Sequence, residues 1–256
     1  MFDYQAPADL LEGKSILITG ASDGIGRACA TCFANHGAMV ILLGRSQSKL
    51  EAVYDEIEKE QPGRVIIHPM DFATAQADDY KELADSLEQQ IGSLDGLLHN
   101  AALLGPRNPI EFYPDQDWQQ LMQVNVNAAF YLTKALLPAL SNSVDARLLF
   151  TSSSVGRVGR AYWGAYAVSK FAVQGLMQTL ADELVNTTSI RVNSLNPGGT
   201  RTAMRRSAYP AEDPQTQPTA ESLMPVYLYL LSPAAQTIHG QALNARDFDP
   251  ATLMSD

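Results

Sequence analysis

The stretch SILITGASDGIG, residues 15–26, joins a short apolar run to a turn that contains Gly20, Gly24 and Gly26. The apolar run is typical of a buried strand, and residues 24–37 after it have a helical pattern. Glycines at such a turn let the backbone approach a bound group, and the start of the helix offers unpaired N–H groups and the positive end of the helix dipole. The stretch predicts a phosphate site, with a tight structural turn as the alternative.

The same alternation of apolar runs and helical patterns continues outward from this stretch to the end of the chain. Near-continuous apolar strands separated by helices are typical of a parallel sheet that is covered on both faces. We therefore predict a doubly wound α/β fold with about seven strands and a ligand site beyond their carboxyl ends. The expected strands are residues 15–19, 39–43, 64–69, 94–100, 147–153, 190–196 and 240–245.

Length and charge narrow the class of protein. The 256 residues suit one domain, residues 1–256, with a single core. The formal net charge of −10 and the absence of a basic run oppose binding to nucleic acid or to an anionic membrane. The polar, acidic start of the sequence does not resemble a signal peptide, and no segment has the length of an apolar membrane span. We expect a cytoplasmic protein.

A metal site is not expected. Cys29 and Cys32 form one C-x-x-C, but no second cysteine pair or suitably spaced histidine accompanies it. Both cysteines lie in an alanine-rich helical pattern, so we interpret them as two small buried residues rather than a redox pair.

Residues 203–225 form the longest irregular stretch, which is rich in proline and polar residues. Its position after the sixth expected strand suits a loop or lid over a substrate pocket, and disorder is the alternative.

A tyrosine and a lysine stand four residues apart in GAYAVSKFAVQG, residues 164–175. Tyr166 and Lys170 would project from one helix face on successive turns, so their polar ends could converge. The pair could be an exposed surface feature. It could also be reactive, because a nearby ammonium group lowers the pKa of a phenol from about 10.

Five motifs together resemble those of the short-chain dehydrogenase/reductase family, in its compact branch of about 250 residues. They are TGASDGIG (19–26), HNAA (99–102), TSSS (151–154), Tyr166-x-x-x-Lys170 and NPGGTRT (196–202). The resemblance covers nearly the whole chain and implies a Rossmann-type sheet. It also implies an oxidoreductase that moves a hydride between a nicotinamide cofactor and a carbonyl or alcohol.

The resemblance implies four catalytic residues. Tyr166 would be the general acid/base, and Lys170 would assist it and hold the nicotinamide ribose. Ser153, 13 residues before Tyr166, would bond the substrate oxygen, with Ser152 and Ser154 as alternatives. Asn125 would position Lys170 through a water and disturb its own helix.

The resemblance also implies the residues that bind the cofactor. Asp71 would meet the adenine, Asn100 and Ala101 the ribose, and Thr202 the carboxamide or the pyrophosphate. The sequence departs from the family at Ala102, where glycine is usual, and at Gly199, where a branched residue is usual. The full expected set is Gly20, Ser22, Asp23, Gly24, Ile25, Gly26, Arg45, Ser46, Asp71, Phe72, Asn100, Ala101, Tyr166, Lys170, Pro197, Gly198, Gly199 and Thr202.

The end of the second expected strand bears on the choice of cofactor. NAD-preferring members of such folds place an acidic residue there, but this chain has Gly44, followed by Arg45 and Ser46. Arg45 offers a cationic fork for a 2′-phosphate, whereas the carboxylate of Asp23 could repel it. We expect NADP(H) to be preferred, with NAD(H) possible.

Two other functions compete with a carbonyl reductase or alcohol dehydrogenase. One is a dinucleotide-binding sensor without turnover, since fold does not imply function. The other is a 3-oxoacyl thioester reductase, in which Arg157, Arg160, Arg205 and Arg206 could meet an acidic carrier protein; dispersed surface arginines are the simpler interpretation.

The substrate is expected to be a small carbonyl or alcohol compound. Tyr162, Trp163 and the 203–225 loop would wall its pocket. Residues 130–137 and 171–180 could form dimer faces typical of the family, so we expect a homodimer or homotetramer. The C-terminal sequence GQALNARDFDPATLMSD departs from the family pattern. The resemblance therefore gives less support to a tetramer than to a dimer.

Overall fold

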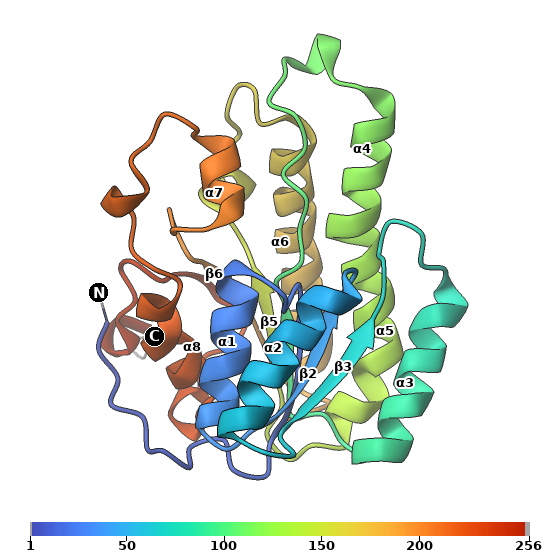
Figure 1. The fold of residues 1–256 in the computed structure, drawn as a ribbon, viewed down its shortest axis with the longest axis vertical. Coiled ribbons are helices and arrows are strands. Elements are labelled where there is room, and N and C mark those ends of the chain that lie inside the picture. Colours follow the sequence, from blue (N-terminus) through green and yellow to red (C-terminus); the bar gives the residue numbers. More distant parts are fainter. Residues whose placement is uncertain (1, 254–256) are drawn as a thin grey trace.

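The structure is a computed structural model that describes residues 2–253, and a seven-stranded parallel sheet forms its centre (Figure 1). The order β3-β2-β1-β4-β5-β6-β7 reverses direction between β1 and β4. The strands are β1 (Ser15–Thr19), β2 (Met39–Gly44), β3 (Val65–Pro69), β4 (Gly96–His99), β5 (Arg147–Thr151), β6 (Arg191–Asn196) and β7 (Ala242–Asn244). The doubly wound fold and its seven strands are therefore confirmed.

Apolar side chains leave the strands on alternate faces of the sheet. In β1, Ile16 and Ile18 pack into one core cluster and Leu17 packs into the other. All three are at most 2% exposed. Both faces are thus buried, which explains why the strands are almost continuously apolar rather than alternating.

Helices cover both faces of the sheet (Figure 1). One face carries α1 (Gly24–Asn35), α2 (Gln47–Glu60) and α8 (Met224–Leu231); the other carries α3 (Ala77–Ile91), α5 (Ala128–Ser141) and α6 (Gly164–Leu184). Two further helices, α4 (Asp115–Met122) and α7 (Ala203–Ala208), extend past the carboxyl ends of the strands. In the part of the chain from 2 to 253, no helix has both the length and the apolar character needed to cross a lipid bilayer.

Short helical turns complete the chain. A π-helical turn, Gln123–Asn127, separates α4 from α5, so the helical pattern over 115–140 is interrupted at Asn125. The 3-10 turns are Ile110–Phe112, Ser154–Gly156, Pro214–Thr216, Glu221–Leu223, Pro233–Ala235 and Pro250–Leu253.

The expectation of one irregular loop over 203–225 is wrong in part. Thr202 accepts a hydrogen bond of 3.1 Å from the backbone N–H of Arg205, and this cap starts α7. Two 3-10 turns follow, and α8 begins at Met224. Two of the four prolines in this stretch, Pro214 and Pro225, lie in the first turn of a helical element, where proline is tolerated.

The two cysteines lie on α1, and both are free thiols. Cys29 is fully buried and Cys32 is half-buried. Burial raises the pKa of the Cys29 thiol well above its usual value and that of Cys32 to about 12. A thiol that stays protonated is a poor nucleophile and a poor metal ligand, which agrees with a packing role for both.

Candidate active site

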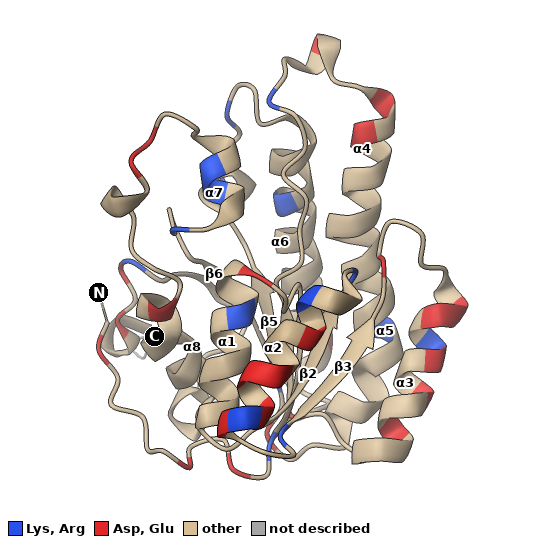
Figure 2. Cartoon of the chain, viewed as in Figure 1, with Lys and Arg blue, Asp and Glu red and all other residues tan. Residues whose placement is uncertain are grey.

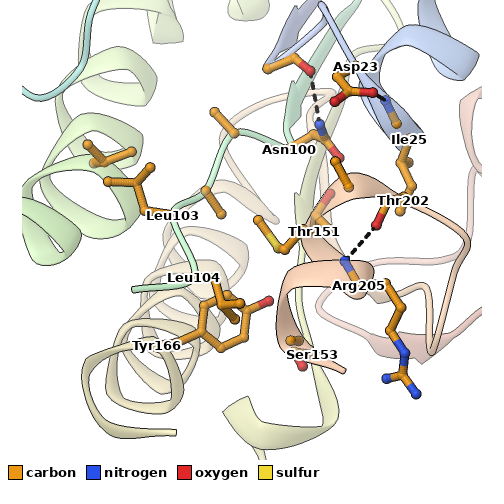
Figure 3. A pocket seen from close by; sticks show the side chains of 18 of the residues that line it. Asp23, Ile25, Asn100, Leu103, Leu104, Thr151, Ser153, Tyr166, Thr202 and Arg205 are labelled. Atoms are coloured by element: carbon orange, nitrogen blue, oxygen red, sulfur yellow. Dashed lines mark hydrogen bonds between the residues drawn. The ribbon is translucent and has the colours of Figure 1, made fainter. Parts of the chain in front are cut away.

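A cavity of about 820 Å³ opens beyond the carboxyl ends of the strands (Figure 3). Residues that follow each strand from β1 to β6 line it, as expected for a site at the point where the strand order reverses. The expected residues that line it are Gly20, Ser22, Asp23, Gly24, Ile25, Arg45, Ser46, Asp71, Phe72, Asn100, Ala101, Ser153, Tyr166, Lys170, Pro197, Gly198, Gly199 and Thr202. Two expected residues, Gly26 and Asn125, do not line this cavity.

The glycine turn after β1 is packed tightly against the end of β4. The hydroxyl of Thr19 accepts hydrogen bonds of 2.9 Å from the backbone N–H groups of Asn100 and Ala101. Gly20 has a φ of +65°, and a Cβ atom there would lie 2.9 Å from the Cα of Ala101. Only glycine suits this conformation and this approach, and the result is an open backbone cradle on the cavity wall.

Gly26 is a packing residue rather than a direct contact of the cavity. A Cβ atom at this position would lie 2.2 Å from the carbonyl oxygen of Gly20 and 2.7 Å from the side-chain nitrogen of Asn100. Its lack of a side chain lets α1 begin directly against the turn. The expectation that Gly26 contacts the cofactor stays a prediction, and its packing role stands beside it.

Asp23 caps the helix that starts at this turn. Its carboxylate accepts a hydrogen bond of 2.7 Å from the backbone N–H of Gly24, and the residue is exposed at the cavity edge. The carboxylate thus has a local structural role at the N-terminus of α1, where a negative charge is favoured.

The ends of β2 and the start of α2 place two cations beside the cavity. Arg45 is exposed and lines it together with Ser46, as expected. Lys49, in the first turn of α2, lines it as well and was missed. Lys49 follows Arg45 closely in the sequence, at the expected start of the second helix, and this is a signal that sequence reasoning could have used.

Lys170 and Tyr166 converge at the opposite end of the cavity. The Lys170 ammonium lies 5.6 Å from the centroid of the Tyr166 ring and donates a hydrogen bond of 2.8 Å to the carbonyl oxygen of Thr151. Lys170 is 4% and Tyr166 is 8% exposed. The pair is therefore buried, and the alternative of an exposed surface pair is wrong.

Burial governs how these two groups titrate. It lowers the pKa of Lys170 to about 8. It raises the pKa of Tyr166 to about 12, and a hydrogen bond with the Ser153 side chain opposes that rise only partly. In the protein without its cofactor, burial therefore outweighs the effect of the Lys170 ammonium on the pKa of Tyr166, because removal of both groups from water favours their neutral forms. A lowering of this pKa by Lys170 together with a bound oxidised nicotinamide stays a prediction.

The three serines after β5 have different surroundings. Ser152 is 2% exposed and donates a hydrogen bond of 3.1 Å to the side-chain oxygen of Gln174 in the core. Ser154 is exposed and begins a 3-10 turn. Ser153 is the serine whose side chain bonds that of Tyr166. Figure 3 places Ser153 and Tyr166 at one end of the pocket, with Asp23 and Ile25 at the other.

Asn125 links the π-helical turn to the helix that carries Tyr166. Its side chain accepts a hydrogen bond of 2.7 Å from the N–H of Leu103 and donates bonds of 2.9 Å to the Leu103 carbonyl and 3.0 Å to the Ser169 hydroxyl. Ser169 in turn donates a bond of 2.8 Å to the carbonyl oxygen of Tyr166. Asn125 and Lys170 share the wall of a second cavity of about 10 Å³, the size of one water.

Aromatic and apolar side chains wall the space beside Tyr166. Trp163 lines the cavity as expected, but Tyr162 does not: it is 57% exposed and has a φ of +69°. Of the 203–225 stretch, only Ala203, Met204, Arg205, Ala208 and Tyr209 line the cavity. The guanidinium of Arg107 lies 4.5 Å from the Trp163 ring and 5.1 Å from the Tyr209 ring, and so ties the loop after β4 to the end of α7.

The residues around the cavity fit a dinucleotide. At one end are a cradle of glycine backbone and the N-terminus of α1, which suit a pyrophosphate. At the other end are the buried Tyr166 and Lys170.

Comparison with known proteins agrees with this geometry. The family model described as short chain dehydrogenase matches residues 14–213. The chain belongs to the short-chain dehydrogenase family of oxidoreductases. Every motif discussed above, from the glycine turn to the residues after β6, lies within the matched range.

Relatives of this short-chain dehydrogenase cover almost its whole length. The oxidoreductase YciK of Escherichia coli K12 is 50% identical over 95% of this chain and 96% of its own. A solved short chain dehydrogenase from Pseudomonas syringae is 56% identical, with a TM-score of 0.92 over 96% of this chain and 100% of that one. Another, from E. coli CFT073 and solved in complex with NADPH, is 50% identical, with a TM-score of 0.91 over 94% of this chain and 99% of that one.

Several residues around the site of this short-chain dehydrogenase had no signal in the sequence. Ser169 reads as an ordinary helical serine, and only its contact with Asn125 reveals a role. Other cavity residues that sequence reasoning left out include Met70, Leu103, Leu104, Gln120, Val124 and Val155. They come from distant parts of the chain, so no local pattern connects them.

Proposed function

We propose that this protein is an NADP(H)-dependent oxidoreductase that interconverts a carbonyl group and an alcohol, with Tyr166 as the general acid/base. The observation that carries the proposal is the placement of Ser153, Tyr166 and Lys170 at one end of a cavity whose other end is the glycine turn. A dinucleotide held by that turn would extend toward Tyr166.

The residues that would hold the cofactor come from six strand ends. The backbone around Gly20 and Gly24, with the N-terminus of α1, would receive the pyrophosphate, and Asp71 and Asn100 lie where the adenosine would bind. The bound cofactor would supply the hydride. The relative crystallised with NADPH supports this assignment.

The chain's own residues would supply the proton and orient the carbonyl. Ser153 would donate a hydrogen bond to the substrate oxygen, and the Tyr166 hydroxyl would pass its proton to the same oxygen during reduction. Burial raises the pKa of Tyr166 to about 12, so the phenol holds its proton at neutral pH, and transfer of that proton requires stabilisation of the phenolate. Protonated Lys170 would stabilise the phenolate that remains.

Arg45 and Lys49 support a preference for NADP(H). Both line the end of the cavity where the chain leaves β2, and neither is in an ion pair among residues 2–253. An exposed guanidinium can bond a 2′-phosphate in a bidentate way, and a neighbouring ammonium adds attraction. The Asp23 carboxylate accepts a hydrogen bond from the Gly24 N–H, which lessens its repulsion of a 2′-phosphate.

The two alternative functions have less support. A sensor without turnover would not need Asn125, Ser153, Tyr166 and Lys170 together, each in a buried or cavity-lining position. The arginine patch for a carrier protein is weakened because Arg157 bonds Asn244 and Leu243, and Arg205 bonds Glu212. A homodimer or homotetramer and a cytoplasmic location stay predictions.

The test is an assay of a panel of aldehydes, ketones, diketones and acyl thioesters with NADPH and with NADH. We expect carbonyl compounds to be reduced with NADPH, at a higher kcat/KM than with NADH. NADPH binding without turnover of any panel member would favour the sensor. Turnover restricted to acyl thioesters would favour the thioester reductase.

A further inference from the structure

The cavity is positively charged although the protein is acidic. Five basic and two acidic residues line it, namely Arg45, Lys49, Arg160, Lys170 and Arg205 against Asp23 and Asp71. The whole chain has a net charge of −10. Figure 2 shows basic residues on α6, on α7 and on the loops beside them, whereas acidic residues gather on α3 and at the start of α4. A cationic pocket in an acidic protein selects for anionic ligands.

Four of the five cations have an assigned partner or role. Arg45 and Lys49 stand at the end of β2, where a 2′-phosphate would bind, and Lys170 belongs to the catalytic group. Arg205 donates two hydrogen bonds of 2.6 Å to the Glu212 carboxylate, so its charge is neutralised within the protein. Arg160 is the cation that remains.

Arg160 lies at the substrate end of the cavity. It belongs to the loop between β5 and α6, three residues before Trp163, and its side chain is exposed. Within residues 2–253 it is in no ion pair, and its guanidinium donates a hydrogen bond of 3.3 Å to the Tyr209 hydroxyl. Tyr209 also lines the cavity, so this contact holds Arg160 beside the pocket and leaves its other N–H groups available.

We propose that Arg160 binds a carboxylate on the substrate, so that the preferred substrates are apolar or aromatic carbonyl compounds with a carboxylate remote from the carbonyl. The inference rests on the proposed function and adds the substrate class to it. Leu104, Val155, Trp163, Met204 and Tyr209 would contact the apolar body. One guanidinium group can bind one carboxylate through two parallel hydrogen bonds. A phosphate carries more charge and would need further cations, but the nearby Arg205 already binds Glu212.

The test compares an acid with its ester, which differ in charge but share the same reacting carbonyl. We would measure kcat/KM with NADPH for 4-formylbenzoate and for methyl 4-formylbenzoate in the unmutated protein and in Arg160→Met, Arg160→Lys and Arg206→Met. Methionine keeps an apolar stem and removes the charge. Arg206 is a matched control, because it is an exposed arginine on α7 that does not line the cavity.

We expect the unmutated protein to favour the acid by about tenfold or more, as a charge-assisted contact would give. In Arg160→Met the ratio should fall to about one, Arg160→Lys should keep part of it, and Arg206→Met should keep all of it. Equal kcat/KM for acid and ester in the unmutated protein would overturn the role of Arg160 while leaving the oxidoreductase assignment intact. The same conclusion would follow if Arg160→Met kept the ratio.

A binding measurement separates this inference from the proposed function. Calorimetric titration of the NADP⁺-bound protein with 4-ethylbenzoate and with 4-ethylbenzamide needs no turnover. We expect tighter binding of the acid, lost in Arg160→Met and kept in Arg206→Met. If neither aldehyde is reduced, the catalytic proposal fails for these compounds and the titration alone decides the carboxylate site. Equal affinity for acid and amide would then refute it.

Discussion

The ammonium group of Lys170 donates a hydrogen bond of 2.8 Å to the backbone oxygen of Thr151 from a position that is 4% exposed. A buried lysine lowers the stability of the folded protein, because the free-energy cost of desolvating its charge is larger than the gain from one hydrogen bond. Lys170 thus joins α6 to the end of β5, but its burial lowers the free energy of unfolding.

Replacing Lys170 by methionine should stabilise the cofactor-free protein and abolish turnover. The pKa of Lys170 is about 8, below the usual 10.5, so between these values the unfolded chain binds the extra proton and stability rises with pH. The free energy of unfolding of the variant should exceed that of the unmutated protein by roughly 2 kcal/mol at pH 7, and this difference should shrink as pH rises from 8 to 10.5. Urea unfolding of both proteins at several pH values measures it. Lys81→Met, at an exposed site on α3, is the control; an advantage that is constant with pH would contradict the argument.

Replacing Tyr166 by phenylalanine should lower turnover by about 10²-fold or more, since only the proton-transferring hydroxyl is removed. NADPH affinity should change by less than about twofold. Single-turnover hydride transfer and cofactor titration give the two values. Tyr162→Phe removes an exposed hydroxyl outside the cavity and should leave both unchanged. Undiminished chemistry in Tyr166→Phe would remove this residue from the assigned role.

Replacing Arg45 by alanine should weaken NADPH binding by roughly 10- to 150-fold and leave NADH binding nearly unchanged, because the lost contact is a charge-assisted one to the 2′-phosphate. The loss should be largest at low salt, since Arg45 is exposed. Titration of both cofactors at two ionic strengths measures this, with Lys81→Ala as the control. Tighter binding of NADH than of NADPH to the unmutated protein would refute the cofactor assignment.

Two glycine-to-alanine changes should have opposite effects. In Gly26→Ala the new methyl group would lie 2.2 Å from the Gly20 carbonyl oxygen, so we expect a loss of about 2 kcal/mol or more and weaker cofactor binding. Gly175 is exposed on α6 with nothing within 4 Å of such a methyl group, and alanine there should add about 0.5–1 kcal/mol. Thermal and urea unfolding test the pair. A harmless Gly26→Ala would contradict the packing argument.

Asn125 and Asn127 share a π-helical turn but should differ in importance. Asn125→Ala removes three hydrogen bonds that join Leu103 and Ser169, and we expect a loss of about 2–3 kcal/mol together with lower turnover. Asn127 is exposed and bonds only the Gln123 side chain, so Asn127→Ala should change stability by less than about 0.5 kcal/mol. Equal effects in the two variants would refute the link between this turn and α6.

The sequence alone determined the elements and the end of the sheet where the site lies. Apolar runs such as residues 15–19 and 39–43 have the length and composition of strands buried on both faces. The helical patterns between these runs indicate that the strands are parallel. The glycine turn and the spacing of Tyr166 and Lys170 are also local features. Local periodicity and local conformational freedom act within a few residues, so they can be read without knowledge of the rest of the chain.

Tertiary structure decided what surrounds each side chain. Ser152 and Ser153 are adjacent, yet the first bonds Gln174 in the core and the second bonds Tyr166. Packing of α6 against β5 also set the titration of Tyr166, in the direction opposite to that expected from its neighbour alone. Burial depends on which distant segments pack together and dominates the free energy of a charge, so these properties could not be obtained from spacing along the chain.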